Sequence, residues 1–225
     1  MNIMKQFYFL IFLTFGFTFF GIAQVALPVD FESTTANYNV VGFGGVDVAV
    51  EANPDASGIN TSNTVVRSTK TAGAEFWAGA EMSLDATIDF STSEKISINT
   101  WSPKANIPVR LKLENASGGF LELDVNTTVT NQWETLTWNF TGQTAGMNFN
   151  KVVVFFEFVP GLGGDGSTYY YDNIEVVAPA PDPVALPVDF ESTTANYNVV
   201  GFGGVDVAVE ANPDASGINT SNTVV

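Results

Sequence analysis

A perfect internal repeat constrains the architecture of this chain more than any other feature. Val184–Val225 repeats Val25–Val66 residue for residue. An identity of this length indicates modules duplicated in tandem. The first copy continues into Arg67 and beyond. The second copy ends with the last residue of the sequence, Val225, which is equivalent to Val66. We therefore expect one complete module at 25–177, followed by a truncated second copy at 184–225. The function should lie in the complete module.

Segments of a different kind flank this module. Residues 1–23 combine a lysine near the start with a Phe-rich apolar stretch and end on Gly21-Ile-Ala23, the pattern of a secretory signal peptide. We expect a secreted or cell-surface protein that has no membrane contact after cleavage before Gln24. The alternative, a transmembrane anchor, is disfavoured because the apolar run is shorter than the ~20 residues of a span. The Pro-rich residues 178–183 are typical of a stiff linker.

The composition excludes several classes of function. The chain has 225 residues, a net charge of −16, and neither Cys nor His. It can therefore form no disulfide, no thiolate zinc site and no Ser-His-Asp triad. The excess of acidic residues argues against nucleic acid as a partner, since phosphate binding needs clustered Lys and Arg. It suits an extracellular surface or a hard cation such as calcium.

Short stretches with alternating apolar and polar residues recur throughout 25–177 and predict half-buried strands. The first is Leu27–Glu32 and the last is Thr168–Val177. Lys151–Val159 is apolar on both sides except at Glu157, which predicts a central strand. The other expected strands are Tyr38–Phe43, Val46–Glu51, Asn63–Ser68, Glu75–Leu84, Lys95–Trp101, Pro108–Asn115, Leu121–Val125 and Trp133–Phe140.

About ten short strands with Gly, Asn and Pro turns, and no helical periodicity, predict an all-β fold. We expect a two-sheet antiparallel β-sandwich of the jelly-roll type. At Gly44-Gly45 two alternatives stay open, because the pair joins two strand-like stretches either as a hairpin turn or as a bend within one strand.

The order of several short motifs resembles a known family. The motifs are Asn53–Ser62, Trp77–Gly79, Trp101–Pro103, Val109–Asn115, Trp133–Trp138 and Tyr169–Ile174. Together they are similar to galactose-binding-like jelly-roll modules of secreted proteins from marine Bacteroidetes. The resemblance covers nearly all of 25–177. It implies polysaccharide binding, a structural calcium ion, and a place within polysaccharide-degrading or glycan-capturing proteins.

The resemblance also implies where calcium would bind. In such modules a Phe-Glu on the first strand and an Asp-Asn-Ile on the last strand carry ligands, and these positions match Glu32 and Asp172. Asp30 shares a strand face with Glu32 and is a third candidate. Calcium takes six to eight oxygen ligands, so carbonyls of the loop with Asn60 and Asn63 would complete the set. The alternative is that these carboxylates are ordinary solvated or turn residues.

Five residues are candidates for contacts with a sugar. Trp77 and Trp101 lie on the strand side opposite the apolar positions, and an aromatic face can stack on a sugar ring. Arg110, Lys112 and Glu157 are expected to point outward and to bind hydroxyl groups. The alternative for either Trp is burial under a loop or between the sheets, since Trp is buried on average.

One strand superficially resembles the catalytic strand of family sixteen glycoside hydrolases. Glu122 and Asp124 match its first two carboxylates, but the final Glu is missing. A retaining pair also needs two carboxyl groups about 5–5.5 Å apart on either side of the scissile bond. A solvated strand face is the simpler interpretation, so we expect no catalytic residues.

We therefore expect a non-catalytic polysaccharide-binding module of a larger secreted bacterial protein, which carries a possible catalytic domain elsewhere. Two alternatives remain. The module is a structural or adhesive repeat without glycan specificity, or it is part of a glycoside hydrolase.

Overall fold

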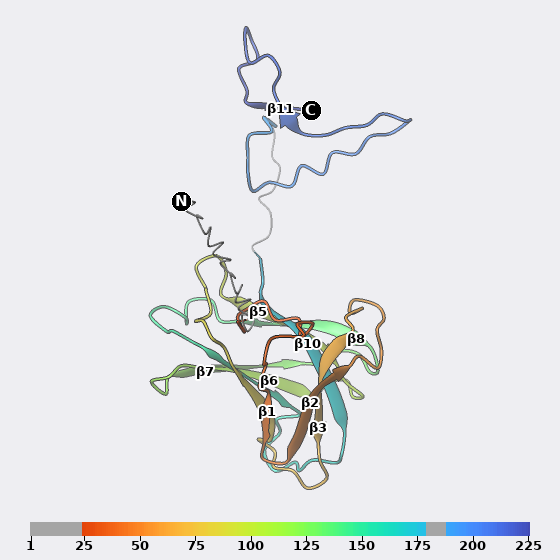
Figure 1. Cartoon of the computed structure of the whole chain (residues 1–225), viewed down its shortest axis with the longest axis vertical. Coiled ribbons are helices and arrows are strands. Elements are labelled where there is room, and N and C mark those ends of the chain that lie inside the picture. Colours follow the sequence, from red (N-terminus) through yellow and green to blue (C-terminus); the bar gives the residue numbers. More distant parts are fainter. Residues whose placement is uncertain (1–23, 179–187) are drawn as a thin grey trace, which may run out of the picture.

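The structure is a computed structural model, and it describes residues 24–178 and 188–225. Throughout these ranges the chain forms strands, turns and loops and no helix. Two antiparallel sheets of five strands each face one another within 24–178 (Figure 1). The expected all-β, two-sheet antiparallel sandwich is confirmed.

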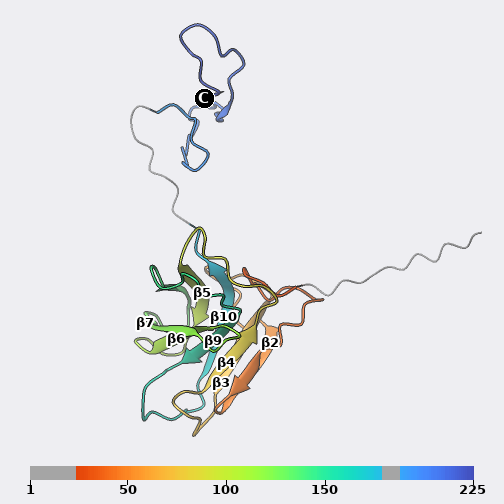
Figure 2. The ribbon, with the colours of Figure 1, turned by 90° about the vertical axis from the view of Figure 1, so that its left-hand side faces the viewer.

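The two sheets interleave in sequence. Sheet A has the spatial order β1 (Val41–Phe43), β4 (Gly79–Ser83), β9 (Lys151–Phe156), β6 (Pro108–Glu114) and β7 (Phe120–Asn126). Sheet B has the order β2 (Val46–Ala52), β3 (Thr64–Lys70), β10 (Thr168–Val176), β5 (Lys95–Trp101) and β8 (Trp133–Asn139). In Figure 2, strands β7, β6, β9 and β4 follow one another across sheet A. The apolar strand β9 occupies the middle of its sheet, as its sequence predicts.

The core lies between the sheets and follows the two-residue period of the strands. On β6 the side chains of Val109, Leu111 and Leu113 are fully buried, while Arg110 and Lys112 point to the other face. The pleat of a strand sends successive side chains to opposite faces, so each inward apolar row produces an outward polar row.

The chain changes sheets at Gly44-Gly45. β1 pairs with β4 in sheet A, whereas β2 pairs with β3 in sheet B. The hairpin alternative is therefore wrong, and the glycine pair is a corner between the sheets. Both glycines have positive φ, at 65° and 103°, which residues with a side chain rarely adopt.

The stretch Leu27–Glu32 differs from the strand expected there. It forms one isolated antiparallel bridge, between Val29 and Ile174 on β10. Phe31 adopts a φ of 57°, outside the range of a regular strand, although Val29 and Phe31 are both buried as the alternation predicts. The segment still joins the two ends of the module, because the bridge puts the first residues that the structure describes beside β10.

The second copy adopts only a fraction of the structure of the first. Its β11 (Glu210–Ala211) pairs with β12 (Thr223–Val224), in the register of the equivalent residues of β2 and β3. Phe202 is 89% exposed, although the equivalent Phe43 is half-buried. The partner strands that cover the first copy come from residues after Val66, and these are not repeated in the second.

The expected signal peptide at 1–23 and all but the first residue of the expected linker at 178–183 lie outside the described residues. Among the residues that are described, no helix has the length and apolar character needed to cross a membrane.

Candidate functional site

The outer face of sheet A carries an open cleft of about 370 Å³. Side chains from all five strands of the sheet and from two adjoining loops line it. They are Phe43, Trp77, Glu81, Arg110, Lys112, Glu114, Glu122, Val153, Phe155 and Phe158. Three of the predicted sugar-contact residues, Trp77, Arg110 and Lys112, therefore lie in one cleft.

Aromatic rings form one side of the cleft. Phe155 projects from the central strand β9, and the ring of Phe43 meets it edge-on at 5.6 Å between centroids. Trp77 stacks on Phe43 at 6.3 Å with 19° between the ring planes. Gly79 makes room for this arrangement, because a Cβ there would lie 2.7 Å from the Phe155 ring. The glycine beside Trp77 thus accommodates Phe155.

Trp77 forms the exposed rim of this aromatic side. It lies in the loop between β3 and β4 and is 42% exposed. Its ring passes over Gly44, where a Cβ would approach it to 2.9 Å. The indole face is therefore held in place by the corner between the sheets while part of it remains open to solvent.

Charged side chains line the cleft beside these rings. Arg110 donates to both oxygens of Asp124, at 2.7 and 2.8 Å, and to Glu122 at 2.9 Å. Its guanidinium also lies 3.8 Å from the centroid of the Phe158 ring. The hydrogen bonds with Asp124 raise the pKa of Arg110 above its ordinary value. Arg110 is thus held between two carboxylates and an aromatic ring.

Trp101, the second predicted aromatic contact, lies elsewhere. It belongs to β5 in sheet B, where it meets Tyr170 edge-on at 5.6 Å. Its indole nitrogen donates to Asp55 at 3.1 Å. The two Trp candidates therefore do not share one site, because their strands belong to different sheets.

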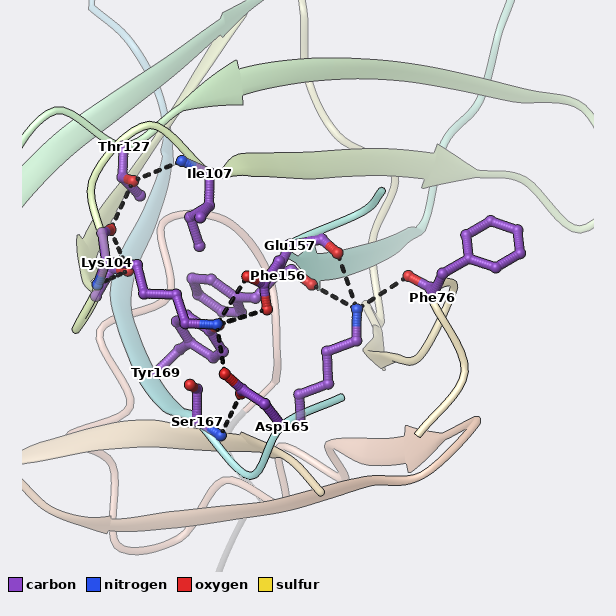
Figure 3. A network of polar contacts seen from close by, with 11 residues as sticks. Phe76, Lys104, Ile107, Thr127, Phe156, Glu157, Asp165, Ser167 and Tyr169 are labelled. Atoms are coloured by element: carbon purple, nitrogen blue, oxygen red, sulfur yellow. Dashed lines mark hydrogen bonds and ion pairs between the residues drawn. The ribbon is translucent and has the colours of Figure 1, made fainter. Parts of the chain in front are cut away.

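Glu157 does not point outward as the alternation predicts. β9 ends at Phe156, and Glu157 adopts a φ of 52° that turns its side chain inward. Its carboxylate accepts hydrogen bonds from Lys104 at 2.7 and 2.9 Å and from the Tyr169 hydroxyl at 3.2 Å (Figure 3). Glu157 is only 6% exposed and lies outside the cleft lining. Its expected outward position is corrected on this ground.

Sequence reasoning missed a buried lysine beneath the rim. Lys70 is 1% exposed and its ammonium group donates to the carbonyl oxygens of Phe76, Phe156 and Glu157 at 3.1, 3.2 and 2.9 Å. Figure 3 shows these three backbone groups converging. Burial lowers the pKa of Lys70. The two-residue period could have indicated this burial, since Lys70 follows the buried Val66 and Ser68 on the same side of β3.

A second polar cluster surrounds Asp172 at the other end of the module. Asp172 is fully buried, and one carboxylate oxygen accepts from the amide of Asn173 at 2.8 Å. Its Oδ2 has no well-formed hydrogen bond within the described residues, although the side chains of Ser62 and Asn60 lie close enough to act on its pKa. The side-chain nitrogen of Asn60 is likewise buried and unpaired. Burial raises the pKa of Asp172 to about 6. Buried polar groups are normally satisfied, so the poorly paired oxygen of Asp172 is a candidate ligand atom.

The predicted calcium ligands are distributed unequally around this cluster. Glu32 accepts from Thr64 and Asn63, and its charge acts on the pKa of Asp172. Asp30 is exposed and accepts from the amide of Glu32 at 3.1 Å. Within the described ranges, no three acidic side chains gather as a metal-binding group. The unpaired oxygen of Asp172 nevertheless fits a hard cation whose other ligands are amide and carbonyl oxygens.

Comparisons with known proteins bear on the fold alone. No family model and no curated protein matches the chain. Among solved structures, an exo-beta-agarase matches with a TM-score of 0.52 and 13% identity over 82% of this chain and 29% of its own. The chain thus spans less than a third of that protein's length. The likeness shows a shared β-sandwich fold.

Two shorter solved structures also match. The family 11 carbohydrate-binding module of Lic26A-Cel5E from Clostridium thermocellum has a TM-score of 0.47 and 16% identity, over 71% of this chain and 96% of its own. TmCBM61, in complex with beta-1,4-galactotriose, has a TM-score of 0.43 and 17% identity, over 70% and 99%.

Proposed function

We propose that residues 25–177 form a non-catalytic module that binds a polysaccharide in the cleft of sheet A. The observation that carries the proposal is Trp77, whose partly exposed ring stacks on Phe43 at the rim of an open cleft. Sugar rings present apolar C–H faces that pack on aromatic side chains, while their hydroxyl groups need polar partners. The cleft of sheet A offers both kinds of group.

The arrangement of carboxylates supports a binding role over hydrolysis. Glu122 and Asp124 come from one strand and both bind Arg110. A glycosidase places its two carboxyl groups on either side of the scissile bond. Here both carboxylates lie on the same face of one strand and bind Arg110, which supports a structural role for the pair.

A structural calcium ion is the second part of the proposal. Asp172 and Glu32 would supply carboxylate oxygens, and Asn60 would supply an amide oxygen. The ion would satisfy the buried oxygen of Asp172 and fasten the first residues of the module to β10. Calorimetric titration with calcium tests this directly. Asp172→Asn is the disrupting variant, and Asp30→Asn, at an exposed position, is the comparison variant. Uptake that persists in Asp172→Asn would refute this assignment.

We further propose that the module belongs to a larger secreted protein. The signal-like leader and the repeated sequence are consistent with an extracellular array, and a catalytic domain elsewhere in the protein would be its partner. Linked copies would raise weak single-site affinity through effective concentration.

Affinity gel electrophoresis of the intact chain tests the binding function. Native gels containing agarose, mixed-linkage β-glucan or β-1,4-galactan should slow the protein in at least one case. Trp77→Ala should abolish the retardation, whereas Trp101→Ala, on the other sheet, should retain it. No retardation in any glycan gel would favour the structural-repeat alternative, and release of reducing sugar would favour an enzyme.

A further inference from the structure

We infer that the cleft of sheet A selects uncharged polysaccharides and rejects sulfated or uronic acid-rich ones. The inference rests on the proposed function and adds the substrate class. It follows from the pairing of the cations of the cleft with carboxylates of the same face.

Both cations that line the cleft are already paired with carboxylates. Arg110 is held by Asp124 and Glu122 through three hydrogen bonds of 2.7 to 2.9 Å. Lys112 forms an ion pair with Glu114 at 2.7 Å and lies 4.5 Å from the centroid of the Phe120 ring. Neither group is free to bind a sulfate or a carboxylate of a ligand.

A third cation on this face is also paired with carboxylates. Lys151, at the start of β9, pairs with Glu81 at 3.0 Å and contacts Glu114 at 3.7 Å. Each cation on this face therefore has a carboxylate partner among the described residues.

The charge balance of the face is negative. Glu81, Glu114, Glu122 and Asp124 outnumber Arg110, Lys112 and Lys151 by one, and the whole chain carries −16. An anionic polymer would meet repulsion both locally and at a distance. Carboxylate oxygens accept hydrogen bonds, and the hydroxyl groups of a neutral sugar donate them. The same face therefore complements an uncharged glycan chain.

A matched pair of polymers tests the inference. The intact chain is run through native gels that contain mixed-linkage β-glucan, agarose or β-1,4-galactan, and through gels with the chemically sulfated form of each. A sulfate about 4 Å from a carboxylate in water meets a repulsion of about 1 kcal/mol, or roughly a fivefold loss of affinity. We expect at least this loss for the sulfated form, and a smaller loss at high salt because charges are screened.

The outcomes separate the inference from the function beneath it. Equal or tighter binding of the sulfated form would overturn the inference and leave glycan binding intact. Failure to bind any of the six polymers would overturn both. Binding of the parent polymer alone supports both.

A charge-neutralising variant provides a second, independent test. Glu122→Gln with Asp124→Asn frees Arg110 and should raise affinity for the sulfated polymer by roughly fivefold. Asp47→Asn with Glu51→Gln is the matched control, because it frees Arg67 on sheet B by the same change of charge. An equal gain in the control would show that only net charge matters and would overturn the assignment to the cleft.

Discussion

The ammonium group of Lys70 lies 2.9 Å from the carbonyl oxygen of Glu157, and this contact ties the end of β3 to the end of β9. The same ammonium group holds the carbonyl of Phe76, the residue before Trp77. One buried cation thus links both loops beside the cleft. The exposed ring that we assign to sugar binding therefore depends on a group that makes no contact with the ligand.

Lys70→Met should destabilise the fold by about 2–4 kcal/mol, because three buried carbonyl groups lose a charged donor. Urea unfolding followed by circular dichroism measures the change. Lys95→Met, at an exposed position at the start of β5, serves as the control. A Lys70→Met protein as stable as the control would show that the buried contacts contribute nothing.

Gly79→Ala should disturb the aromatic side of the cleft. The new methyl group would lie 2.7 Å from the Phe155 ring and 2.9 Å from a backbone oxygen, so overpacking should cost about 1–3 kcal/mol. Glycan affinity should fall with it, because Phe155 supports Phe43 and Trp77. Gly163→Ala is a suitable control, since its methyl group would meet only one atom, at 3.4 Å. Equal stability and affinity in the two variants would contradict the role of Gly79.

Asp165 should make stability depend on pH in the acid range. Its hydrogen bonds with Lys104 and Ser167, at 2.8 and 3.0 Å, lower its pKa in the folded state. The unfolded chain therefore binds this proton more readily, and the stabilisation is present above the ordinary pKa of about 4. It is lost as pH falls towards the folded pKa.

The carboxylate of Asp165 is largely exposed, so the effect should stay below about 1 kcal/mol. Melting curves between neutral and strongly acid pH should show a shallower loss of stability for Asp165→Asn than for the wild type. Identical slopes would mean that the ion pair with Lys104 is fully screened.

Removal of residues 184–225 should leave the melting temperature of the first module unchanged. The second copy buries little, with Ile218 fully exposed and Phe202 nearly so. Its partner strands are not duplicated in this sequence. Differential scanning calorimetry of the shortened and full chains makes the comparison. A large drop on deletion would show that the second copy contributes to the fold by exchanging with the first.

One physical rule, the two-residue period of strands, predicts both the fold and three residues of the cleft, Trp77, Arg110 and Lys112. Pleated strands alternate with a strict period of two, so the buried row Val109, Leu111 and Leu113 fixes Arg110 and Lys112 on the outer face. The alternation also places Trp77 opposite the core. Strand order in the two sheets is not encoded locally, so the alternation gives no sign that Trp101 belongs to sheet B.

Local backbone conformation explains the other differences. The positive φ of Glu157 reverses its side chain, and the positive φ of Phe31 ends the expected first strand. Both residues are of types that rarely adopt this conformation, so propensity gives no warning. The sequence gives Lys70 no predicted role, since its expected strand ends at Ser68 and a buried lysine is rare unless it is paired. Its partners are backbone carbonyls brought together only by the tertiary fold.

Tryptophan fluorescence of the intact chain, titrated with the polysaccharide that retards it in gels, tests the central claim most directly. Trp133 and Trp138 are buried, and the indole nitrogen of Trp101 donates a hydrogen bond to Asp55. Trp77 should therefore dominate any change in fluorescence on binding. We expect a blue shift and protection from acrylamide quenching in the wild type. Trp77→Phe, which keeps an aromatic ring, should still bind but lose both signals. The same shift and protection in Trp77→Phe would contradict a sugar site at the rim of the sheet A cleft.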